Sequence, residues 1–291
     1  MLYLQTFLDS LMIGGVYSVI AVGLSLIFGV MRVINWSHGE SLMVSMLLAL
    51  YLNQYTSLNP YVIMIITGIV MFGYGYLLQN VVISRILARE KAREPISCLL
   101  FTAGLGMALS NGALLIFGPK QVMAQTQYTG KSLHLGELIV SVPKLIAFIL
   151  AVIFVAALWI FLQKTEYGRA IRATSQNRSV ATLMGISEKR VYSLSFAIGT
   201  MLVGLAGGML IPYFPVYPTV GSVFSNKSFV IVVLGGKGSV PGALLGGLII
   251  GLIEKFGTLF FSDSVSQIIV FLMFIAILLF KPTGLLSKDK G

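Results

Sequence analysis

The stretch that decides the fold is Leu11-Met-Ile-Gly-Gly-Val-Tyr-Ser-Val-Ile-Ala-Val-Gly-Leu-Ser-Leu-Ile-Phe-Gly-Val-Met31, which contains no charged side chain. A straight membrane helix needs about 20 predominantly apolar residues, and this run supplies them. The run is too long for the apolar part of a cleavable signal peptide, no basic segment precedes it, and Asp9 lies just before it. We therefore expect a helix that is retained in the membrane.

The composition of the whole chain points the same way. Of the 291 residues, 57% are hydrophobic and 10% are charged, and the mean hydropathy is +0.93. Soluble domains carry about 25% charged residues, so a soluble fold is excluded. The apolar runs are continuous, whereas the strands of a membrane barrel alternate between apolar and polar residues. The predicted fold is all-α, a polytopic transmembrane helical bundle.

Apolar runs recur along the chain and define the candidate membrane segments. Two of them, 39–52 and 226–235, are shorter than the roughly 20 residues of a straight span, so we expect one or two broken or half helices there. The prediction is about eight or nine membrane segments in a single transmembrane domain, residues 1–291. The runs lie near residues 7–31, 39–52, 60–83, 96–118, 143–162, 192–213, 226–235, 240–261 and 265–280.

The distribution of basic residues predicts the topology. Segments 84–94 and 163–191 and the tail from Lys281 hold most of the Lys and Arg residues, and cytoplasmic loops are enriched in both. The loop 119–142 holds few basic residues and is expected on the outer side, together with the N-terminus. The net charge of +10 is therefore interpreted as a topology signal and not as a nucleic-acid-binding surface.

The sequence predicts no catalytic residue and no metal site. His38 and His134 are the only histidines and Cys98 is the only cysteine, so neither a zinc site nor a disulfide is expected. Neither Gly130-Lys-Ser132 nor Gly236-Lys-Gly238 has the spacing of a nucleotide-binding loop, so ATP hydrolysis is not expected on this chain. We identify no pair of carboxylates deep in a span, which argues against a proton-driven pump.

The polar run Asn35-Trp-Ser-His-Gly-Glu40 opens the short span 39–52. One interpretation is a capped helix end, with Asn35 or Ser37 as the cap and Glu40 in the positively polarised first turn. The other is a pathway or gate, because ionisable groups in a span are costly unless they pair or line a wet cavity, and Arg32 and Glu40 could pair. The candidate residues are Asn35, Ser37, His38, Gly39 and Glu40.

A second candidate is the break Leu234-Gly-Gly-Lys-Gly-Ser-Val-Pro-Gly242 between two apolar runs. Glycines and a proline at this density interrupt a helix, and they predict either a tight turn or a hinge. The residues concerned are Gly235, Gly236, Gly238, Pro241 and Gly242.

The polar segment 163–191 is the third candidate, and it suits one or two short helices. Arg169 and Arg172 lie three residues apart and share a helix face. An amphipathic knob with basic flanks fits docking into a groove of a soluble partner. Anchoring of an interfacial helix to anionic lipid fits equally well. The candidate residues are Gly168, Arg169, Arg172, Asn177, Ala181, Met184 and, as a helix stop, Gly185.

Four separated motifs together resemble the permeases of branched-chain amino acid ABC transporters, specifically the high-affinity H-type subunit. Trp36 and Lys237 stand where that family often has small or apolar residues. The motifs are Gly14–Gly29 followed by Arg32–Glu40, then Gly168-Arg-Ala-Ile-Arg-Ala173 with Met184-Gly-Ile186, then Val233–Gly242, and finally Lys281-Pro-Thr-Gly-Leu285.

The resemblance implies an ATP-driven importer in the bacterial inner membrane, in which this chain is a transport subunit and not an enzyme. It implies a second homologous permease, two ATPase subunits that bind ATP and Mg, and an extracytoplasmic solute-binding protein. The chain itself would hold no cofactor. Segment 163–191 becomes the coupling segment, with Arg169 and Arg172 in polar contacts and Ala181 and Met184 in groove packing. Alternatives are the same importer class for urea, amides or another small solute, an ATP-independent secondary transporter, or a purely structural subunit.

Overall fold

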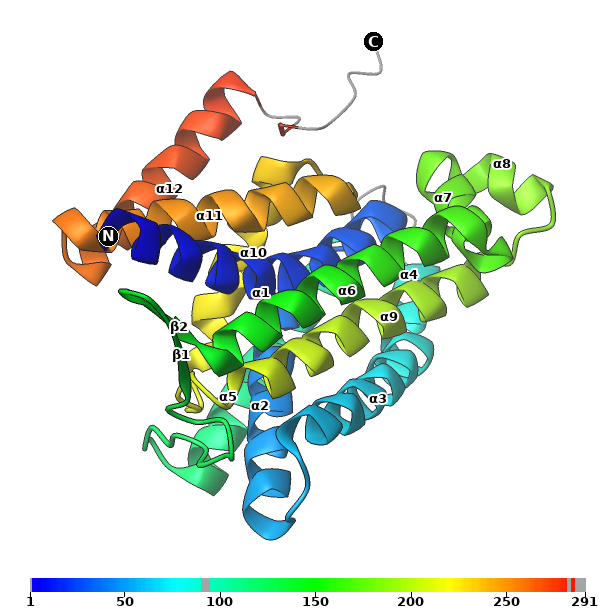
Figure 1. Cartoon of the computed structure of the whole chain (residues 1–291). Helices are drawn as coiled ribbons and strands as arrows, with labels where there is room; N and C mark the ends of the chain where they lie inside the picture. The colour runs from blue at the N-terminus through cyan, green and yellow to red at the C-terminus, as the bar shows by residue number, and fades with distance from the viewer. Residues whose placement is uncertain (1, 90–94, 282–283, 286–291) are drawn as a thin grey trace.

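The computed structural model describes residues 2–89, 95–281 and 284–285. Within them the chain is mainly helical, which confirms the predicted all-α membrane bundle (Figure 1). The helices are α1 Leu2–Met31, α2 His38–Tyr55, α3 Pro60–Leu78, α4 Ser84–Arg89, α5 Ile96–Phe117, α6 Val142–Lys164, α7 Glu166–Gln176, α8 Arg178–Leu183, α9 Glu188–Leu210, α10 Val220–Gly235, α11 Val240–Phe260 and α12 Asp263–Phe280. A π-helical turn, η1 Gln79–Ile83, joins α3 to α4.

In the described part of the chain, seven helices are long and apolar enough to cross a membrane, with α3, η1 and α4 counting as one. The two short runs correspond to α2 and α10. Helix α10 has 16 residues, fewer than a straight span needs, as predicted. Helix α2 is longer than its apolar run, at 18 residues, because polar residues extend it at both ends. Four of the basic residues on which the predicted topology rests, Lys91, Arg93, Lys288 and Lys290, lie outside the described residues.

Helices α1 and α9 form the centre of the bundle. Each buries most of its length inside the protein, whereas α5 and α12 leave most of theirs exposed. Helix α9 packs on α3 through Gly204 and Gly208, and α11 packs on α1 through Gly247 and Gly251. A Cβ atom on Gly204 would lie only 2.7 Å from the Thr67 carbonyl oxygen, so the two backbones touch. Glycines spaced four apart thus bring these helices together, as small residues do in membrane proteins.

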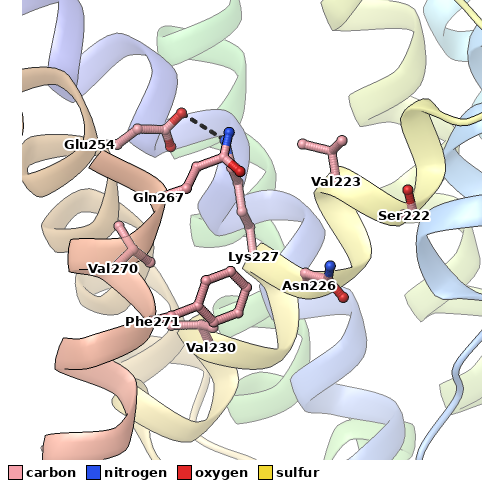
Figure 2. Close-up of a pocket in the computed structure, with 9 residues that line it drawn as sticks. All are labelled: Ser222, Val223, Asn226, Lys227, Val230, Glu254, Gln267, Val270 and Phe271. Atoms are coloured by element: carbon pink, nitrogen blue, oxygen red, sulfur yellow. Dashed lines mark hydrogen bonds and ion pairs between the residues drawn. The ribbon is translucent and has the colours of Figure 1, made fainter. Parts of the chain in front are cut away.

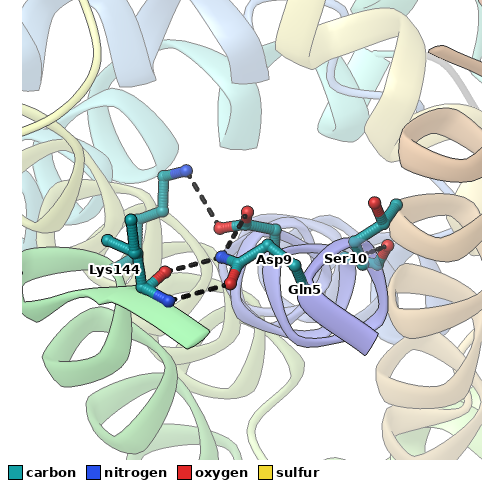
Figure 3. Close-up of polar contacts among 6 residues, drawn as sticks. Gln5, Asp9, Ser10 and Lys144 are labelled. Atoms are coloured by element: carbon teal, nitrogen blue, oxygen red, sulfur yellow. Dashed lines mark hydrogen bonds and ion pairs between the residues drawn. The ribbon is translucent and has the colours of Figure 1, made fainter. Parts of the chain in front are cut away.

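A two-stranded antiparallel hairpin, β1 Ser132–Leu135 and β2 Leu138–Ser141, occupies the loop before α6 and was not expected. The side-chain amide of Gln5 pairs with its edge, donating to the Ile139 carbonyl at 2.6 Å and accepting from the Ile139 N–H at 3.0 Å. Beside this contact Lys144 forms an ion pair with Asp9 at 3.2 Å (Figure 3). These bonds hold the hairpin against the start of α1.

The hairpin and the polar segment 163–191 lie at opposite ends of the bundle, since α6 runs from one to the other (Figure 1). The end of α1 lies near α7, and Gly29 touches Gly238 in the turn before α11. The predicted topology requires this separation of the outer loop from the basic segment.

Candidate functional site

Helices α7 and α8 form because each has its own polar cap. The Thr165 hydroxyl accepts a hydrogen bond from the Gly168 N–H at 3.0 Å and starts α7. The Asn177 side chain accepts from the Val180 N–H at 3.2 Å and starts α8. Gly185, at a φ of +82°, ends the pair in a conformation that disfavours other residues. Of the predicted residues, Asn177 and Gly185 therefore shape the segment, and Gly168 packs against the last turn of α6.

The apolar surface of this helix pair differs from the predicted one. Ala181, expected to pack into a partner's groove, is only 4% exposed and is buried within the chain itself. A six-residue helix packed beside α9 must turn one side inward, and Ala181 lies on that side. Met184 is 78% exposed, as its predicted role requires, and Leu183 is 86% exposed. With Val180 they form the outward knob, defined here as Val180, Leu183 and Met184.

The basic residues of the segment divide into two groups. Arg169 is exposed and pairs only loosely with Glu166, at 3.8 Å, and Arg172 donates to the Gln163 side chain. Exposed pairs of this kind contribute little stability, so both guanidinium groups remain open to other partners. Arg178, which the sequence analysis did not single out, forms an ion pair with Glu188.

The predicted gate residues are brought together where α2 begins, and most of them are buried. The Ser37 hydroxyl donates to the Asn35 side-chain oxygen at 2.8 Å, and the His38 Nε2 lies 2.9 Å from the Ile20 carbonyl oxygen. Ser37 occupies the N-cap position without a side-chain capping bond, so the expected cap does not form. Arg32 and Glu40, both in the described part of the chain, make no ion pair, since the Glu40 carboxylate lies beside Gly106 of α5.

This start of α2 also carries polar atoms that find no hydrogen-bond partner among the described residues. They are the Asn35 Nδ2, the His38 Nδ1 and the Glu40 Oε2. Buried polar groups are normally satisfied, and exceptions concentrate where water, an ion or a substrate has a place. The two interpretations of this run, a helix end and a gate, therefore both remain predictions.

Helix α10 crosses α2 at this point with the two backbones in contact. A Cβ atom on Gly221 would lie 2.7 Å from the Gly39 carbonyl oxygen, so glycine is required on both sides. The Ser225 hydroxyl donates to the Trp36 carbonyl at 3.3 Å, and the Trp36 ring packs on Phe229 with centroids 5.2 Å apart. Any shift of α10 must therefore move the start of α2.

The glycine-rich break forms a closely packed turn between α10 and α11. Gly236 and Gly238 have φ values of +94° and +83°, which a side chain would strain. Gly235 touches Gly242 across the turn. The Ser239 hydroxyl caps α11 by accepting from the Gly242 N–H at 3.1 Å, and Pro241 lies in the first turn of that helix.

A buried ion pair lies in the spans, which the sequence analysis missed. The Lys227 ammonium of α10 donates to the Glu254 carboxylate of α11 at 2.7 Å and to the Tyr17 hydroxyl of α1 at 2.8 Å. The Tyr17 hydroxyl in turn donates to Glu254 at 3.3 Å. The Lys227 and Glu254 side chains are only 15% and 16% exposed. The available signal was the presence of charged residues in two apolar runs, Lys227 in 226–235 and Glu254 with Lys255 in 240–261.

The ion pair borders a cavity of about 110 Å³ between α10, α11 and α12 (Figure 2). In Figure 2 the Gln267 amide of α12 reaches toward the ion pair. Phe271 and Val230 line the part of the cavity that lies away from the ion pair. A water molecule takes about 30 Å³ in the liquid, so the cavity can hold more than one.

Comparisons with known proteins give the chain a family. It is 29% identical to the high-affinity branched-chain amino acid transport system permease protein BraD of Pseudomonas aeruginosa, over 99% of this chain and 97% of that protein. It is 29% identical to the permease protein LivH of Escherichia coli, over 99% and 96%. The ribose import permease protein RbsC of Bacillus subtilis is 30% identical over 53% of this chain and 48% of its own length. No solved structure matches.

The family model described as the permease component of branched-chain amino acid transport systems matches residues 6–278. That range takes in the start of α2, the helix pair α7–α8 and the glycine-rich turn, and it ends in α12. The chain therefore belongs to the family of branched-chain amino acid transport permeases, and it is a multi-span membrane transport subunit.

Proposed function

We propose that this chain forms half of the translocation pathway of an ATP-driven importer for branched-chain amino acids, and that a second, related permease forms the other half. Full-length similarity to permeases named for this transport supports the substrate class. The chain acts in this proposal as one domain in the plasma membrane of a bacterium. Two ATPase subunits, which bind ATP and Mg, dock on one side, and a solute-binding protein delivers substrate on the other.

The observation that carries the proposal is the outward knob at the end of the bundle. Val180, Leu183 and Met184 expose apolar side chains on a helix pair whose own caps are complete. A short helix that presents apolar side chains to the outside suits a groove in a partner protein. Arg169 and Arg172 lie on the neighbouring α7 with exposed or half-buried guanidinium groups, available for polar contacts at the rim of such a groove.

Motion of the docked ATPases reaches the pathway through α9. Helix α8 is tied to α9 by the Arg178–Glu188 ion pair. Helix α9 in turn packs on α1, α2 and α3, and the Ser45 hydroxyl of α2 donates to the Gly204 carbonyl of α9 at 2.8 Å. Closure of the ATPase pair thus pulls on α9, and the buried polar cluster at the start of α2 acts as the gate.

Two alternatives make different predictions. The same importer class for urea, amides or another small solute differs only in the solute carried. An ATP-independent secondary transporter needs an ionisable group in the membrane, and Glu254 is such a group. Because Glu254 is neutralised by Lys227 at 2.7 Å, it is not a free carboxylate poised to take up a proton, and the importer is favoured.

The deciding experiment is gentle purification of the tagged chain from its native membrane, followed by reconstitution of whatever is recovered. We expect a second permease and ATP-binding subunits in the preparation, and L-leucine uptake that requires both ATP and the solute-binding protein. A chain that purifies alone and transports leucine without ATP would establish the secondary transporter. Uptake of urea or an amide in place of leucine would overturn the substrate class.

A further inference from the structure

The Lys227–Glu254 pair lies inside the membrane helices and not in a loop, because Lys227 is half-way along α10, Tyr17 is half-way along α1 and Glu254 lies in the last third of α11. Charged side chains within membrane helices are costly and are usually kept for function. Stability alone does not explain the pair, since a buried ion pair can often be replaced by apolar residues without loss of stability. The pair therefore calls for a role that apolar residues could not fill.

The hydrogen-bond inventory of the pair is incomplete in a specific way. An ammonium group has three N–H donors, and Lys227 uses two of them, toward Glu254 and Tyr17. The second carboxylate oxygen of Glu254, Oε2, is buried and has no partner among the described residues. One cationic donor and one anionic acceptor are thus left over at the edge of the same cavity.

The other residues that line the cavity form an apolar wall and a polar mouth. Val223, Val230, Val270 and Phe271 provide the apolar wall. Ser222, Asn226 and Gln267 line the mouth and are exposed. Polar side chains in a span rarely face lipid, so the mouth opens toward water or toward another subunit.

We propose that this cavity is a transit site for a zwitterionic amino acid in the membrane-spanning part of the permease. The free N–H of Lys227 binds the substrate carboxylate, helped by the amides of Asn226 and Gln267. The Glu254 Oε2 binds the substrate ammonium group, and the branched side chain packs on Val230, Val270 and Phe271. A net-neutral pair suits a net-neutral ligand, and neither charge is left unpaired when the ligand leaves. The inference rests on the proposed amino-acid substrate.

The test uses the complete transporter, reconstituted with its ATPases and binding protein, and radiolabelled L-leucine as the probe. The double variant Lys227→Gln/Glu254→Gln removes both charges and leaves polar side chains at both positions. We expect ATP hydrolysis and assembly to persist while leucine uptake falls roughly ten- to hundredfold, as expected for the loss of hydrogen bonds to charged groups. The matched control is Asp9→Asn/Lys144→Gln, which removes an ion pair at the outer edge and should leave uptake unchanged.

A second measurement keeps the native pair and does not depend on the folding of the double variant. Asn226→Cys in a Cys98→Ser background places one thiol at the mouth, and its labelling by a water-soluble thiol reagent is followed in the assembled complex without binding protein. Millimolar L-leucine should slow the labelling, whereas leucinamide, which lacks the carboxylate, and 4-methylpentanoate, which lacks the amine, should not.

Unchanged leucine uptake by the double glutamine variant, or labelling that L-leucine does not slow, would overturn the transit site. The proposed function would survive either result, because the wild-type complex would still import leucine. A wild-type complex that imports no leucine would remove both the proposed function and the site that rests on it.

Discussion

Arg178 and Glu188 form an ion pair at 2.5 Å that joins the first residue of α8 to the first residue of α9. The Arg178 guanidinium also lies over the Tyr192 ring, 5.6 Å from its centroid. The helix pair that carries the outward knob is therefore attached to the central helix of the bundle at a defined point. In the proposed importer, this attachment is where force from a docked ATPase would enter the membrane domain.

The first prediction concerns that attachment. Replacing Arg178 with Ala should lower the number of leucine molecules imported per ATP hydrolysed, because α8 can then move without pulling α9. Both rates are measured in proteoliposomes. The charge swap Arg178→Glu/Glu188→Arg should recover part of the ratio, and Glu166→Gln, which breaks only the loose exposed contact to Arg169, should leave it unchanged. A normal ratio in Arg178→Ala would show that the coupling runs elsewhere.

The second prediction concerns Arg172. Replacing it with Glu should abolish transport while the protein still reaches the membrane, since the reversed charge would repel the acidic groups that an arginine contacts in a partner. Membrane content is measured by immunoblot and transport by leucine uptake. Normal transport by this variant would remove Arg172 from the coupling segment.

The third prediction separates the knob from its buried side. Leu183→Ser should change folding stability by no more than about 0.5 kcal/mol, because the side chain is 86% exposed. Recovery of ATPase subunits with the tagged permease should nevertheless fall several-fold. Ala181→Asp should instead destabilise the α7–α8 pair, since it places an unpaired charge in a buried position. Full recovery of the ATPases with Leu183→Ser would contradict a docking role for the knob.

The fourth prediction concerns Glu40. Replacing it with Gln should slow uptake if the carboxylate serves the pathway, because its Oε2 has no partner among the residues that the structure describes to explain a purely structural role. A role limited to the helix dipole is worth about 0.3–1 kcal/mol, so it would change stability slightly and leave uptake intact. Initial uptake rates at equal membrane content distinguish the two roles.

The fifth prediction concerns the crossing of α2 and α10. Gly221→Ala should impair uptake or assembly, since the new methyl group would meet the Gly39 carbonyl oxygen at 2.7 Å and the Glu40 backbone at 2.8 Å. Gly104→Ala in α5 is the matched control, because a Cβ atom there meets no atom within 4 Å. Alanine is the better helix former, so the control should be neutral or slightly stabilising. Equal behaviour of the two variants would show that the crossing is not constrained.

The membrane helices were the predictable part of this fold, and α5 shows why. Its predicted range, 96–118, and its observed range, Ile96–Phe117, almost coincide. The length of an apolar run reports the thickness of the bilayer and does not depend on which helices pack together. The helix cap at Asn177 and the helix stop at Gly185 also depend only on residues that are close in the sequence. The stop at Gly185 was predicted.

Contacts between segments that are far apart in the chain could not be predicted from the sequence. Lys227 and Glu254 are 27 residues apart in different apolar runs, and Lys255 is the neighbour of Glu254 in the sequence, so no local pattern pairs Glu254 with Lys227. The hairpin is held by Gln5, 134 residues from its partner Ile139. Six residues are too few to predict which side of α8 faces the bundle. Ala181 was therefore predicted to face a partner, whereas it is buried within the chain. The predicted ion pair between Arg32 and Glu40 does not form, because the Glu40 carboxylate packs beside α5.

The Lys227–Glu254 pair also constrains how the chain enters the bilayer during synthesis. Helix α10 has 16 residues with a lysine at its centre, and a lysine there disfavours insertion by about 2.5–3.5 kcal/mol. The neutralising carboxylate arrives only with α11, one short turn later. We therefore expect the two helices to leave the translocation machinery as a single helical hairpin, and to do so after the first helix has placed the Tyr17 hydroxyl where the charged pair will settle.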